Sequence, residues 1–427
     1  MREPGAPVAP AGCVACGRVA ARPLYEVNGF AIVGCACGLA RTVLPPGFDP
    51  ASIYTEDYFH GGHPDGYADY TASGEELRHE FRRILAALRT HVPGGSLIEI
   101  GCAYGYFLDE AAAQFRTLGV EISDHAREVC LGRGLDAIAE ATPEALAARG
   151  PFDAAVMLDV LEHMPDPGVT LDALHGAMRP GGQLVLSTGD FASAIARGMG
   201  KHWRLMTPPQ HLWFFSPATV TALLRRHGFR VHTVEHPWKL VPVALALYQA
   251  SRYVGGQDLI RRLMPPGRIP INLFDAMRVI ATHIPDDDAG YLRSYALAAR
   301  QARGRVLDLG CGLGGGTRLL AASATGVVGV EGDPAVRARA TARPAAANVR
   351  FDATAPTAFH DPEGFDQVVV LDPLGGITDL DLVIVRALAA LRPTGLLVTT
   401  PAAQPLAARY GLVEVDRDDA SIAWRRA

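Results

Sequence analysis

The sequence predicts an α/β protein with two tandem doubly wound sheets, preceded by a small cysteine-rich arm. Three observations support this fold class. Short apolar runs alternate with helical segments from residue 96 onward, a glycine turn between strand and helix occurs twice, and four cysteines lie within the first 37 residues. Such alternation is typical of a mostly parallel sheet covered by helices on both faces. At 427 residues the chain is long enough for two or three domains.

The composition restricts the class of protein. Apolar residues make up 49% and charged residues 20%, as in soluble globular proteins. The net charge of −5 argues against a nucleic-acid partner, because dedicated nucleic-acid binders are usually basic. The longest apolar stretch, Leu240–Leu247, is far shorter than the roughly 20 residues that a membrane span needs. Met1–Ala20 has no apolar core typical of a secretory signal, so we expect a cytoplasmic protein without stable membrane insertion.

The N-terminal arm, residues 1–49, carries a candidate metal site. Cys13 and Cys16 are separated by two residues, and Cys35 and Cys37 by one. Paired cysteines of this kind hold zinc tetrahedrally, and a cytoplasmic chain favours metal over disulfide. We therefore predict a structural zinc knuckle. The one-residue spacing of the second pair leaves an unmetallated or three-ligand site as the alternative.

A first α/β domain is expected over residues 50–284. It opens with an amphipathic helix in which Leu77, Phe81 and Leu88 share one face. An insertion at residues 237–270 is expected to contain a helix, Val241–Tyr253, and residues 285–288 resemble a linker. The expected strands are Ser96–Gly101, Thr117–Ile122, Asp153–Leu158, Gln183–Ser187, Arg230–Glu235 and Met277–His283.

Residues 289–427 repeat the pattern of the first domain. The stretch Leu97–Gly105 has its counterpart in Val306–Gly314, and Gly119–Glu121 has its counterpart in Gly329–Glu331. The offset between matching positions drifts only from 209 residues at the glycine turn to 213 at the later strands. Several matches in register indicate an internal duplication, so the second domain should have the same fold.

Each copy carries a candidate cofactor site. A strand that ends in an acidic residue and turns through glycines into a helix lets the backbone approach a nucleotide-like ligand closely. A second acid at the end of the next strand can accept hydrogen bonds from ribose hydroxyls. The candidate residues are Glu99, Gly101, Ala103, Gly105 and Glu121 in the first copy, and Asp308, Gly310, Gly312, Gly314 and Glu331 in the second.

Further motifs distinguish between classes of nucleotide site. The first copy lacks the three glycines of the dinucleotide fingerprint. Asp159, Glu162 and His163 follow the fourth strand, and an Arg-Pro-Gly-Gly segment opens the fifth. In this order the motifs strongly resemble class I S-adenosylmethionine methyltransferases. The resemblance implies Rossmann-like, seven-stranded, mostly parallel sheets, with Glu99 near the methionine end of the cofactor, Glu121 at the ribose, and Asp159 and His163 beside the methyl group.

Three segments of the first domain resemble a narrower group. They are Tyr54–Tyr58, Gln210–Pro217 and Arg268–Asp275, and they look like the bacterial methyltransferases of glycan and natural-product pathways, many of which carry a zinc knuckle. The group includes deoxysugar C-methyltransferases, in which a glutamate stands where this chain has Gln210. The resemblance implies methyl transfer to a hydroxyl or carbon of a small molecule such as a sugar, glycan or biosynthetic intermediate. It leaves homo-oligomer formation open.

Two histidines are candidate catalytic residues. Methyl transfer to a hydroxyl or carbon requires removal of a proton, and an imidazole titrates near neutral pH. His211 is the first candidate base and His163 the second, although each could instead brace a loop. Trp203, Trp213 and Phe214 form either an apolar substrate wall or part of the core.

The role of the second copy stays open at this stage. It has no counterpart of Glu162 and His163, which favours a degenerate domain retained for packing over an independent second methyltransferase. Two further alternatives concern the whole protein. One is an NAD(P)-dependent oxidoreductase, and the other is a non-catalytic scaffold that uses duplicated Rossmann-like domains.

Overall fold

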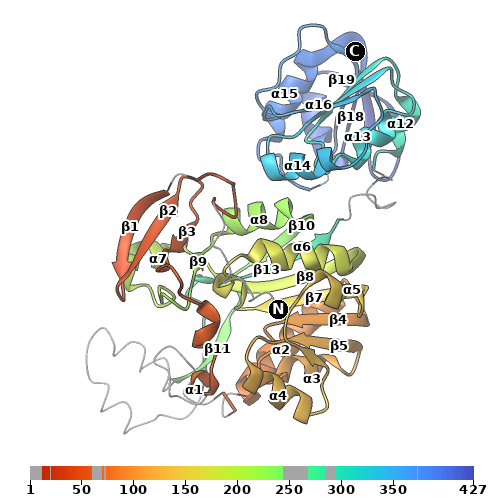
Figure 1. The fold of residues 1–427 in the computed structure, drawn as a ribbon. Helices are drawn as coiled ribbons and strands as arrows, with labels where there is room; N and C mark the ends of the chain where they lie inside the picture. The colour runs from red at the N-terminus through yellow and green to blue at the C-terminus, as the bar shows by residue number, and fades with distance from the viewer. Residues whose placement is uncertain are drawn as a thin grey trace.

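The computed structural model describes residues 12–19, 21–59, 70–71, 74–243, 268–284, 292, 294–372 and 374–427. Two lobes are visible in Figure 1, each built on a seven-stranded sheet, and the N-terminal arm lies against the first lobe. The two tandem sheets confirm the predicted fold class. The expected helix Val241–Tyr253 is wrong at its start, because Val241 and Pro242 belong to a strand that pairs with residues 268–271, and residues 244–253 lie outside the described residues. The expected linker 285–288 also lies outside them.

The first sheet has the strand order β10-β13-β8-β7-β4-β5-β6, and only β13 runs antiparallel to the rest. All six strands expected from the sequence belong to it. Glu99 pairs with Gly119 on one side and with Val156 on the other, so neighbouring strands end together. The strands are β4 (Gly95–Ile100), β5 (Phe115–Val120), β6 (Ala137–Ile138), β7 (Phe152–Leu158), β8 (Met178–Gly189), β10 (Phe229–Glu235) and β13 (Ala276–His283).

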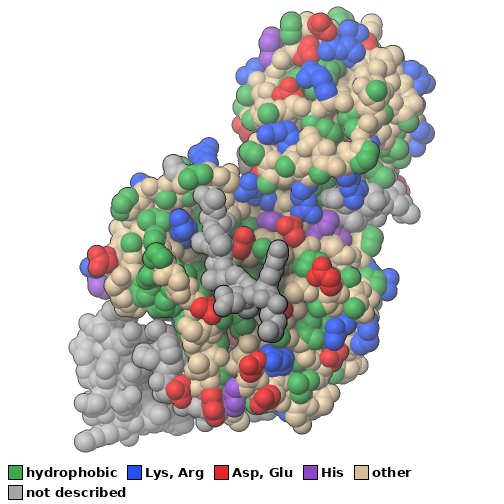
Figure 2. Space-filling model, viewed as in Figure 1, with side chains coloured by type: hydrophobic (Ala, Val, Ile, Leu, Met, Phe, Trp, Pro, Cys, Tyr) green, Lys and Arg blue, Asp and Glu red, His purple; other side chains and the backbone are tan. Residues whose placement is uncertain are grey.

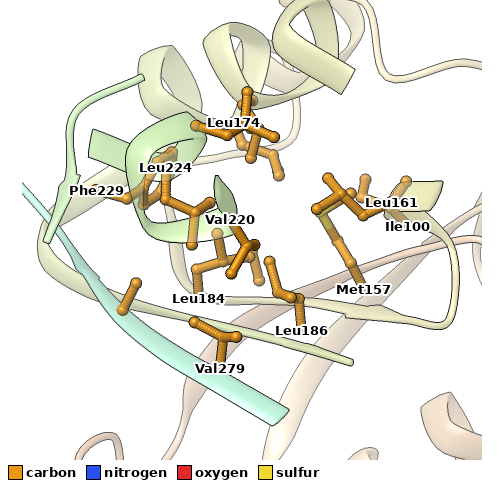
Figure 3. Packing of buried hydrophobic residues seen from close by; sticks show 14 of the residues in the cluster. Ile100, Met157, Leu161, Leu174, Leu184, Leu186, Val220, Leu224, Phe229 and Val279 are labelled. Atoms are coloured by element: carbon orange, nitrogen blue, oxygen red, sulfur yellow. The ribbon is translucent and has the colours of Figure 1, made fainter. Parts of the chain in front are cut away.

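Helices cover both faces of this sheet. Figure 3 shows α6 and α8 packed on one face, where Leu174, Val220 and Leu224 meet Leu184 and Leu186 of β8. The apolar face predicted for the first helix, α2, packs with α3 on the opposite face. The helical segments are η1 (Pro50–Ile53), α1 (Glu56–Phe59), α2 (Gly74–Arg89), α3 (Tyr106–Ala111), α4 (Asp124–Gly132), α5 (Pro143–Ala147), η2 (Leu161–His163), α6 (Pro167–Ala177), α7 (Ala194–Met199), η3 (Gly200–His202) and α8 (Pro217–Arg226).

The arm forms a separate antiparallel sheet that includes a strand from the first lobe. Strands β1 (Ala21–Val27), β2 (Phe30–Cys35) and β3 (Ala40–Thr42) pair in order, and β9 (Trp213–Phe214) pairs with β3. A fourth, two-stranded sheet joins β11 (Lys239–Pro242) to β12 (Arg268–Ile271). The arm is therefore fastened to the segment that directly follows His211.

The second lobe repeats the strand order of the first. Its sheet runs β16-β15-β14-β17-β18-β20-β19, with β20 antiparallel to its neighbours. Two apolar clusters cover its faces. The elements are α12 (Ala296–Gln301), β14 (Arg305–Leu309), α13 (Gly315–Leu320), β15 (Gly326–Val330), α14 (Pro334–Ala342), β16 (Val349–Asp352), β17 (Phe365–Val370), α15 (Leu380–Ala390), β18 (Leu391–Thr399), η4 (Pro401–Ala403), α16 (Gln404–Arg409), β19 (Leu412–Arg417) and β20 (Ile422–Arg426).

Within the described part of the chain, no helix combines the length and the hydropathy needed to cross a bilayer.

Candidate functional site

The glycine turn after β4 has the conformation that the sequence predicts. Gly101, Ala103 and Gly105 all have positive φ, at 74°, 46° and 75°. A Cβ on Gly101 would lie 3.1 Å from one methyl of Val160 and closer still to the other, so only glycine fits without displacing that side chain. The turn therefore brings bare backbone to the carboxyl edge of the sheet, between β4 and the segment after β7.

Glu99, the acid at the end of β4, is a buried acceptor. Its side chain is 3% exposed, and Glu99 Oε2 has no hydrogen-bond partner among the described residues. Burial, reinforced by Cys130 and Glu121, raises the pKa of Glu99 well above its ordinary value. A buried oxygen without a donor fits a ligand that brings one, as the amino group of S-adenosylmethionine would.

Glu121, at the end of β5, is held in place by backbone donors. The N–H of Ala103 donates to Glu121 Oε2 and the N–H of Ser123 donates to Oε1, both at 2.8 Å. Burial raises the pKa of Glu121, while these two N–H groups oppose the increase. The carboxylate thus links the glycine turn to the next strand, at the position where an acid binds ribose in doubly wound nucleotide sites.

The segment after β7 brings Asp159 to the same edge. Asp159 has a positive φ of 53°, and its Oδ1 accepts a hydrogen bond from the Ser187 hydroxyl at 2.8 Å. His163, four residues on, lies with its Nδ1 3.0 Å from the carbonyl oxygen of Gln210. Burial lowers the pKa of His163, although that carbonyl and Asp159 oppose the decrease.

His211 lies beside His163, with the two ring centroids 4.7 Å apart. Its Nδ1 is 2.7 Å from the carbonyl oxygen of Leu205, so Nδ1 carries the proton and Nε2 carries the lone pair. Burial, together with the neighbouring His163, lowers the pKa of His211 to about 3. The imidazole is therefore neutral at physiological pH, and the same burial weakens Nε2 as a base in the protein without ligand.

Hydrogen bonds to main-chain groups hold the loop that carries His211. The hydroxyl of Thr42, in β3 of the arm, donates to the carbonyl oxygen of His211 at 2.7 Å. On the other side, the N–H of Leu212 donates to the carbonyl oxygen of Glu162 at 2.8 Å. The loop is thus fixed between the arm and the segment after β7, which brings both candidate histidines together.

Aromatic residues of the segment before α2 cover the glycine turn. Phe59 stacks on Tyr104 of the turn, with ring centroids 5.0 Å apart. Tyr58, its neighbour, accepts a hydrogen bond from Gln210 Nε2 at 2.7 Å. Gln210 therefore connects the aromatic cover to the histidine loop.

The four arm cysteines form one cluster, the knuckle. Their sulfur atoms all lie within 4.8 Å of one another, and the closest pairs, Cys13 with Cys37 and Cys16 with Cys35, are 3.5 Å apart. Tetrahedral zinc with bonds of about 2.3 Å places its sulfur ligands about 3.8 Å apart. The donor set and its spacing are compatible with zinc despite the one-residue gap between Cys35 and Cys37.

The second copy keeps the shape of the turn but uses its acids differently. Gly310, Gly312 and Gly314 have φ of 76°, 56° and 76°, which closely match the first copy. Asp308 accepts hydrogen bonds from the hydroxyls of Tyr295, at 3.0 Å, and Thr317, at 2.7 Å. Burial raises its pKa to about 7, and these hydroxyls oppose the increase. Among the residues that the structure describes, no comparable hydroxyl pair meets Glu99.

The structure brings all the predicted first-copy residues to one edge of the sheet. Trp203, Trp213 and Phe214 are no more than 3% exposed, so they belong to the core and do not form a substrate wall. Two contributors were missed. Thr42 gave no sequence signal, because its partner lies 169 residues away. Tyr58 lay in a segment singled out only by resemblance, and its bond to Gln210 spans 152 residues.

A comparison with protein families identifies the class. The family described as Methyltransferase domain matches residues 73–234 and again residues 285–424. The chain therefore belongs to this methyltransferase family, and S-adenosylmethionine is its cofactor. The first match contains Glu99, Glu121 and Asp159, and the second contains Asp308 and Glu331.

Curated relatives point to the same chemistry. Ubiquinone biosynthesis O-methyltransferase of Xylella fastidiosa (strain 9a5c) is 28% identical over 169 residues, which are 35% of this chain and 69% of the relative. The protein of the same description from Xanthomonas campestris pv. campestris (strain B100) is 29% identical over 173 residues, covering 36% and 72%.

Solved structures of methyltransferases match the chain at low identity and low TM-score. A SAM-dependent methyltransferase from Archaeoglobus fulgidus is 19% identical with a TM-score of 0.35, covering 53% of this chain and 97% of its own. Magnesium protoporphyrin IX methyltransferase from Synechocystis PCC 6803 with bound SAH is 14% identical with a TM-score of 0.35, covering 53% and 93%.

Proposed function

We propose that the first domain methylates a hydroxyl group of a small molecule, with His211 as the base. One observation carries this proposal. His211 is a neutral imidazole whose Nδ1 is committed to the Leu205 carbonyl, which leaves Nε2 as a proton acceptor at the carboxyl edge of the sheet. The relatives' description as O-methyltransferases supports an oxygen acceptor, and the replacement of glutamate by Gln210 weakens the case for carbon.

The residues around the turn would hold the cofactor. Glu99 offers a buried acceptor to the amino group, Glu121 offers its carboxylate to the ribose, and the glycine turn lets the ligand approach. Bound S-adenosylmethionine supplies an electrophilic methyl group. In the transfer, the acceptor oxygen would bond to this methyl as the sulfur–carbon bond breaks, and His211 Nε2 would take the hydroxyl proton. His163, 4.7 Å away ring to ring, positions His211 in this scheme.

The acceptor class follows from resemblance and remains part of the proposal. Tyr54–Tyr58 and Gln210–Pro217 support a sugar, a glycan or a biosynthetic intermediate as the acceptor. The knuckle serves this function from a distance, because β3 and Thr42 hold the main chain around His211. Compared with the oxidoreductase and scaffold alternatives, methyl transfer has the support of the family match.

The test uses hydroxyl acceptors of different acidity. Wild type and His211→Asn are assayed with S-adenosylmethionine on a sugar, a plain phenol and a nitrophenol, which, unlike the other two, is ionised to a large extent at neutral pH. Because the variant lacks the base, we expect it to lose turnover on the sugar or plain phenol but to retain it on the nitrophenol. Equal losses on every acceptor that wild type uses would overturn the role of His211. Wild-type product methylated at carbon would overturn the oxygen acceptor.

A further inference from the structure

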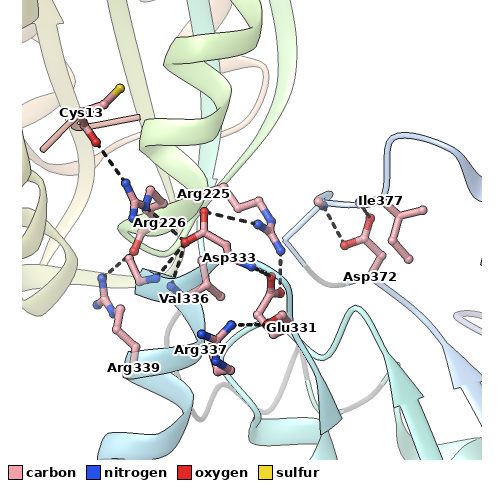
Figure 4. A network of polar contacts seen from close by, with 12 residues as sticks. Cys13, Arg225, Arg226, Glu331, Asp333, Val336, Arg337, Arg339, Asp372 and Ile377 are labelled. Atoms are coloured by element: carbon pink, nitrogen blue, oxygen red, sulfur yellow. Dashed lines mark hydrogen bonds and ion pairs between the residues drawn. The ribbon is translucent and has the colours of Figure 1, made fainter. Parts of the chain in front are cut away.

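An arginine of the first domain reaches the second copy of the cofactor motif. Arg225, in the last turn of α8, places Nη2 2.6 Å from Glu331 Oε2, as Figure 4 shows. Glu331 is buried, with 2% of its side chain exposed, and Arg225 is mostly buried, with 13% exposed. Burial lowers the pKa of Arg225, but the Glu331 carboxylate more than offsets this and holds it above its ordinary value. The pair is a buried, charge-assisted contact between domains.

The oxygen atom of Glu331 that Arg225 binds corresponds to one particular oxygen atom of Glu121 in the first domain. Glu121 Oε1 accepts the N–H of Ser123, and Glu331 Oε1 accepts the N–H of Asp333, in each case at 2.8 Å. The other oxygen of Glu121 faces the glycine turn and accepts the N–H of Ala103. In the second copy this other oxygen accepts the guanidinium of Arg225 instead.

The guanidinium also lies against the opposite wall of the site. A Cβ on Gly376 would collide with the Nε, Cζ and Nη2 atoms of Arg225. Gly376 belongs to the loop after β17, where its N–H donates to Asp372 at 2.7 Å, and this loop corresponds to the segment after β7 in the first domain. Arg225 therefore lies between the acid after β15 and the loop after β17, where the motifs place the cofactor.

A second arginine fixes this contact to the arm. Arg226 donates from Nε to Asp333 Oδ1 at 3.2 Å and from Nη1 to the carbonyl oxygen of Val14, in the knuckle, at 3.1 Å. Arg339 of α14 completes the junction by pairing with Asp172 at 3.0 Å. Basic side chains gather at the junction of the two lobes in Figure 2. The position of Arg225 is thus held from both domains.

We propose that the cofactor crevice of the second domain is a guanidinium-binding site, occupied by Arg225 of the same chain and closed to S-adenosylmethionine. The ribose-binding acid has become an interdomain contact, while the turn that would receive the cofactor keeps its shape. The chain therefore binds one cofactor, in the first domain, and the second site opens when Arg225 is removed. This inference rests on cofactor binding by the first domain.

Calorimetric titration with S-adenosylhomocysteine tests the closure. We expect wild type to show one binding event, lost in Glu121→Ala and kept in Glu331→Ala. Arg225→Ala should show a second event, and Arg225→Ala combined with Glu331→Ala should lose that event again. Arg225→Lys is the matched control, because it keeps a cation at the site and should keep a single event. Two events in wild type, one of them removed by Glu331→Ala, would overturn the proposal.

A second variant, which keeps more of the side chain, covers the case in which Arg225→Ala misfolds. Arg225→Gln retains most of the aliphatic stem and removes the charge, so it should also reveal the second event. If both Arg225→Ala and Arg225→Gln fold, bind one cofactor in the first domain and show no second event, Arg225 does not close the site. Loss of all binding in wild type would instead contradict cofactor binding itself, which separates that failure from this one.

Discussion

Each of the two lobes has its own sheet of the same strand order, a glycine turn and a pair of acids, yet the lobes differ in the groups that those acids contact. In the first lobe Glu99 keeps an oxygen without a partner among the described residues, and the hydrogen bonds that these residues give to the Glu121 carboxylate come from the N–H groups of Ala103 and Ser123. In the second lobe Asp308 is satisfied by two hydroxyls and Glu331 by Arg225. A buried acceptor without a donor indicates a site prepared for a ligand, whereas one with internal donors stabilises the fold.

The same distinction extends to the segments around the acids. The first lobe adds the arm, the aromatic cover and the loop with His211, all anchored to the carboxyl edge. In the second lobe, the described residues at that edge meet α8 of its neighbour instead. A duplicated fold can thus keep its backbone geometry while one copy binds ligand and the other binds protein.

The largest expected effect concerns the knuckle of the arm, which is attached to the first lobe through the pairing of β3 with β9. Cys16→Ala should lose the metal and disorder the arm, because structural zinc contributes on the order of 10 kcal/mol to small metal-dependent folds. Since β3 pairs with β9 beside His211, turnover should fall at least about tenfold. Cys311→Ala, at a buried thiol of the second domain, is the matched control. Metal content and turnover are measured together, and full turnover without metal would show that the knuckle does not support the active site.

The next effect distinguishes a catalytic imidazole from a structural one. His211→Asn should lower kcat by about 10²- to 10⁴-fold, the usual contribution of a general base, while S-adenosylhomocysteine affinity stays unchanged. His175→Asn is the control, because burial lowers the pKa of His175 to about 3 as well, but its ring packs against His283. Steady-state kinetics on both variants should show the loss in the first alone. A similar loss in both would mean that His211 acts through the fold.

A reciprocal pair of substitutions tests the acids directly. Glu99→Ala should weaken S-adenosylhomocysteine binding by about 10- to 100-fold, the worth of hydrogen bonds to a charged group. Asp308→Ala should leave that affinity intact but cost roughly 2 to 5 kcal/mol of stability, because it leaves two buried hydroxyls without an acceptor. Calorimetry and chemical denaturation measure the two quantities. The comparison between the lobes fails if Asp308→Ala weakens binding as much as Glu99→Ala does.

The last expected effect is a pH dependence in the second lobe. Because the pKa of Asp308 is about 7 in the folded protein and near 3.8 when unfolded, the native state retains a proton that the unfolded chain releases. Stability should therefore fall as pH rises from about 4 to about 7, by at most about 1.4 kcal/mol per pH unit. Asp308→Asn lacks this ionisable group, so the melting temperature of the variant relative to that of wild type should rise as pH increases from about 4 to about 7.

Asp366 provides a control of opposite sign. Burial raises the pKa of Asp366, but the N–H of Arg305 and the guanidinium of Arg392 hold it below the ordinary value. Its contribution to stability is present above about pH 4 and is lost at lower pH. A constant difference between wild type and Asp308→Asn from pH 4 to pH 7 would show that Asp308 is ionised throughout.

Much of the fold was predictable from the sequence, because local pattern determines strands. Apolar runs such as Asp153–Leu158 are buried on both faces, so they were easily recognised as strands. The glycines of each turn, which have positive φ, identified both cofactor motifs. The repeat offset predicted the second sheet. In each case the signal lies within a few neighbouring residues.

Contacts between distant segments were not predictable in this way. The pairing of β3 with β9 joins two short runs with no distinctive composition, and Arg225 is one of two adjacent arginines at an ordinary helix end. Nothing local marks which of the two reaches Glu331, 106 residues later. The distinction between an open and a closed copy depends on these long-range contacts, so the sequence left it undecided.

The strand shared between the arm and the first lobe constrains the order in which the protein can fold. Thr42 meets its partner only after 169 further residues have been made, so the arm leaves the ribosome long before β9 exists. Contacts so far apart in sequence form late, since the intervening chain must first be ordered. Metal uptake by the arm can thus come early during synthesis, whereas methyl transfer must wait until the loop closes onto it.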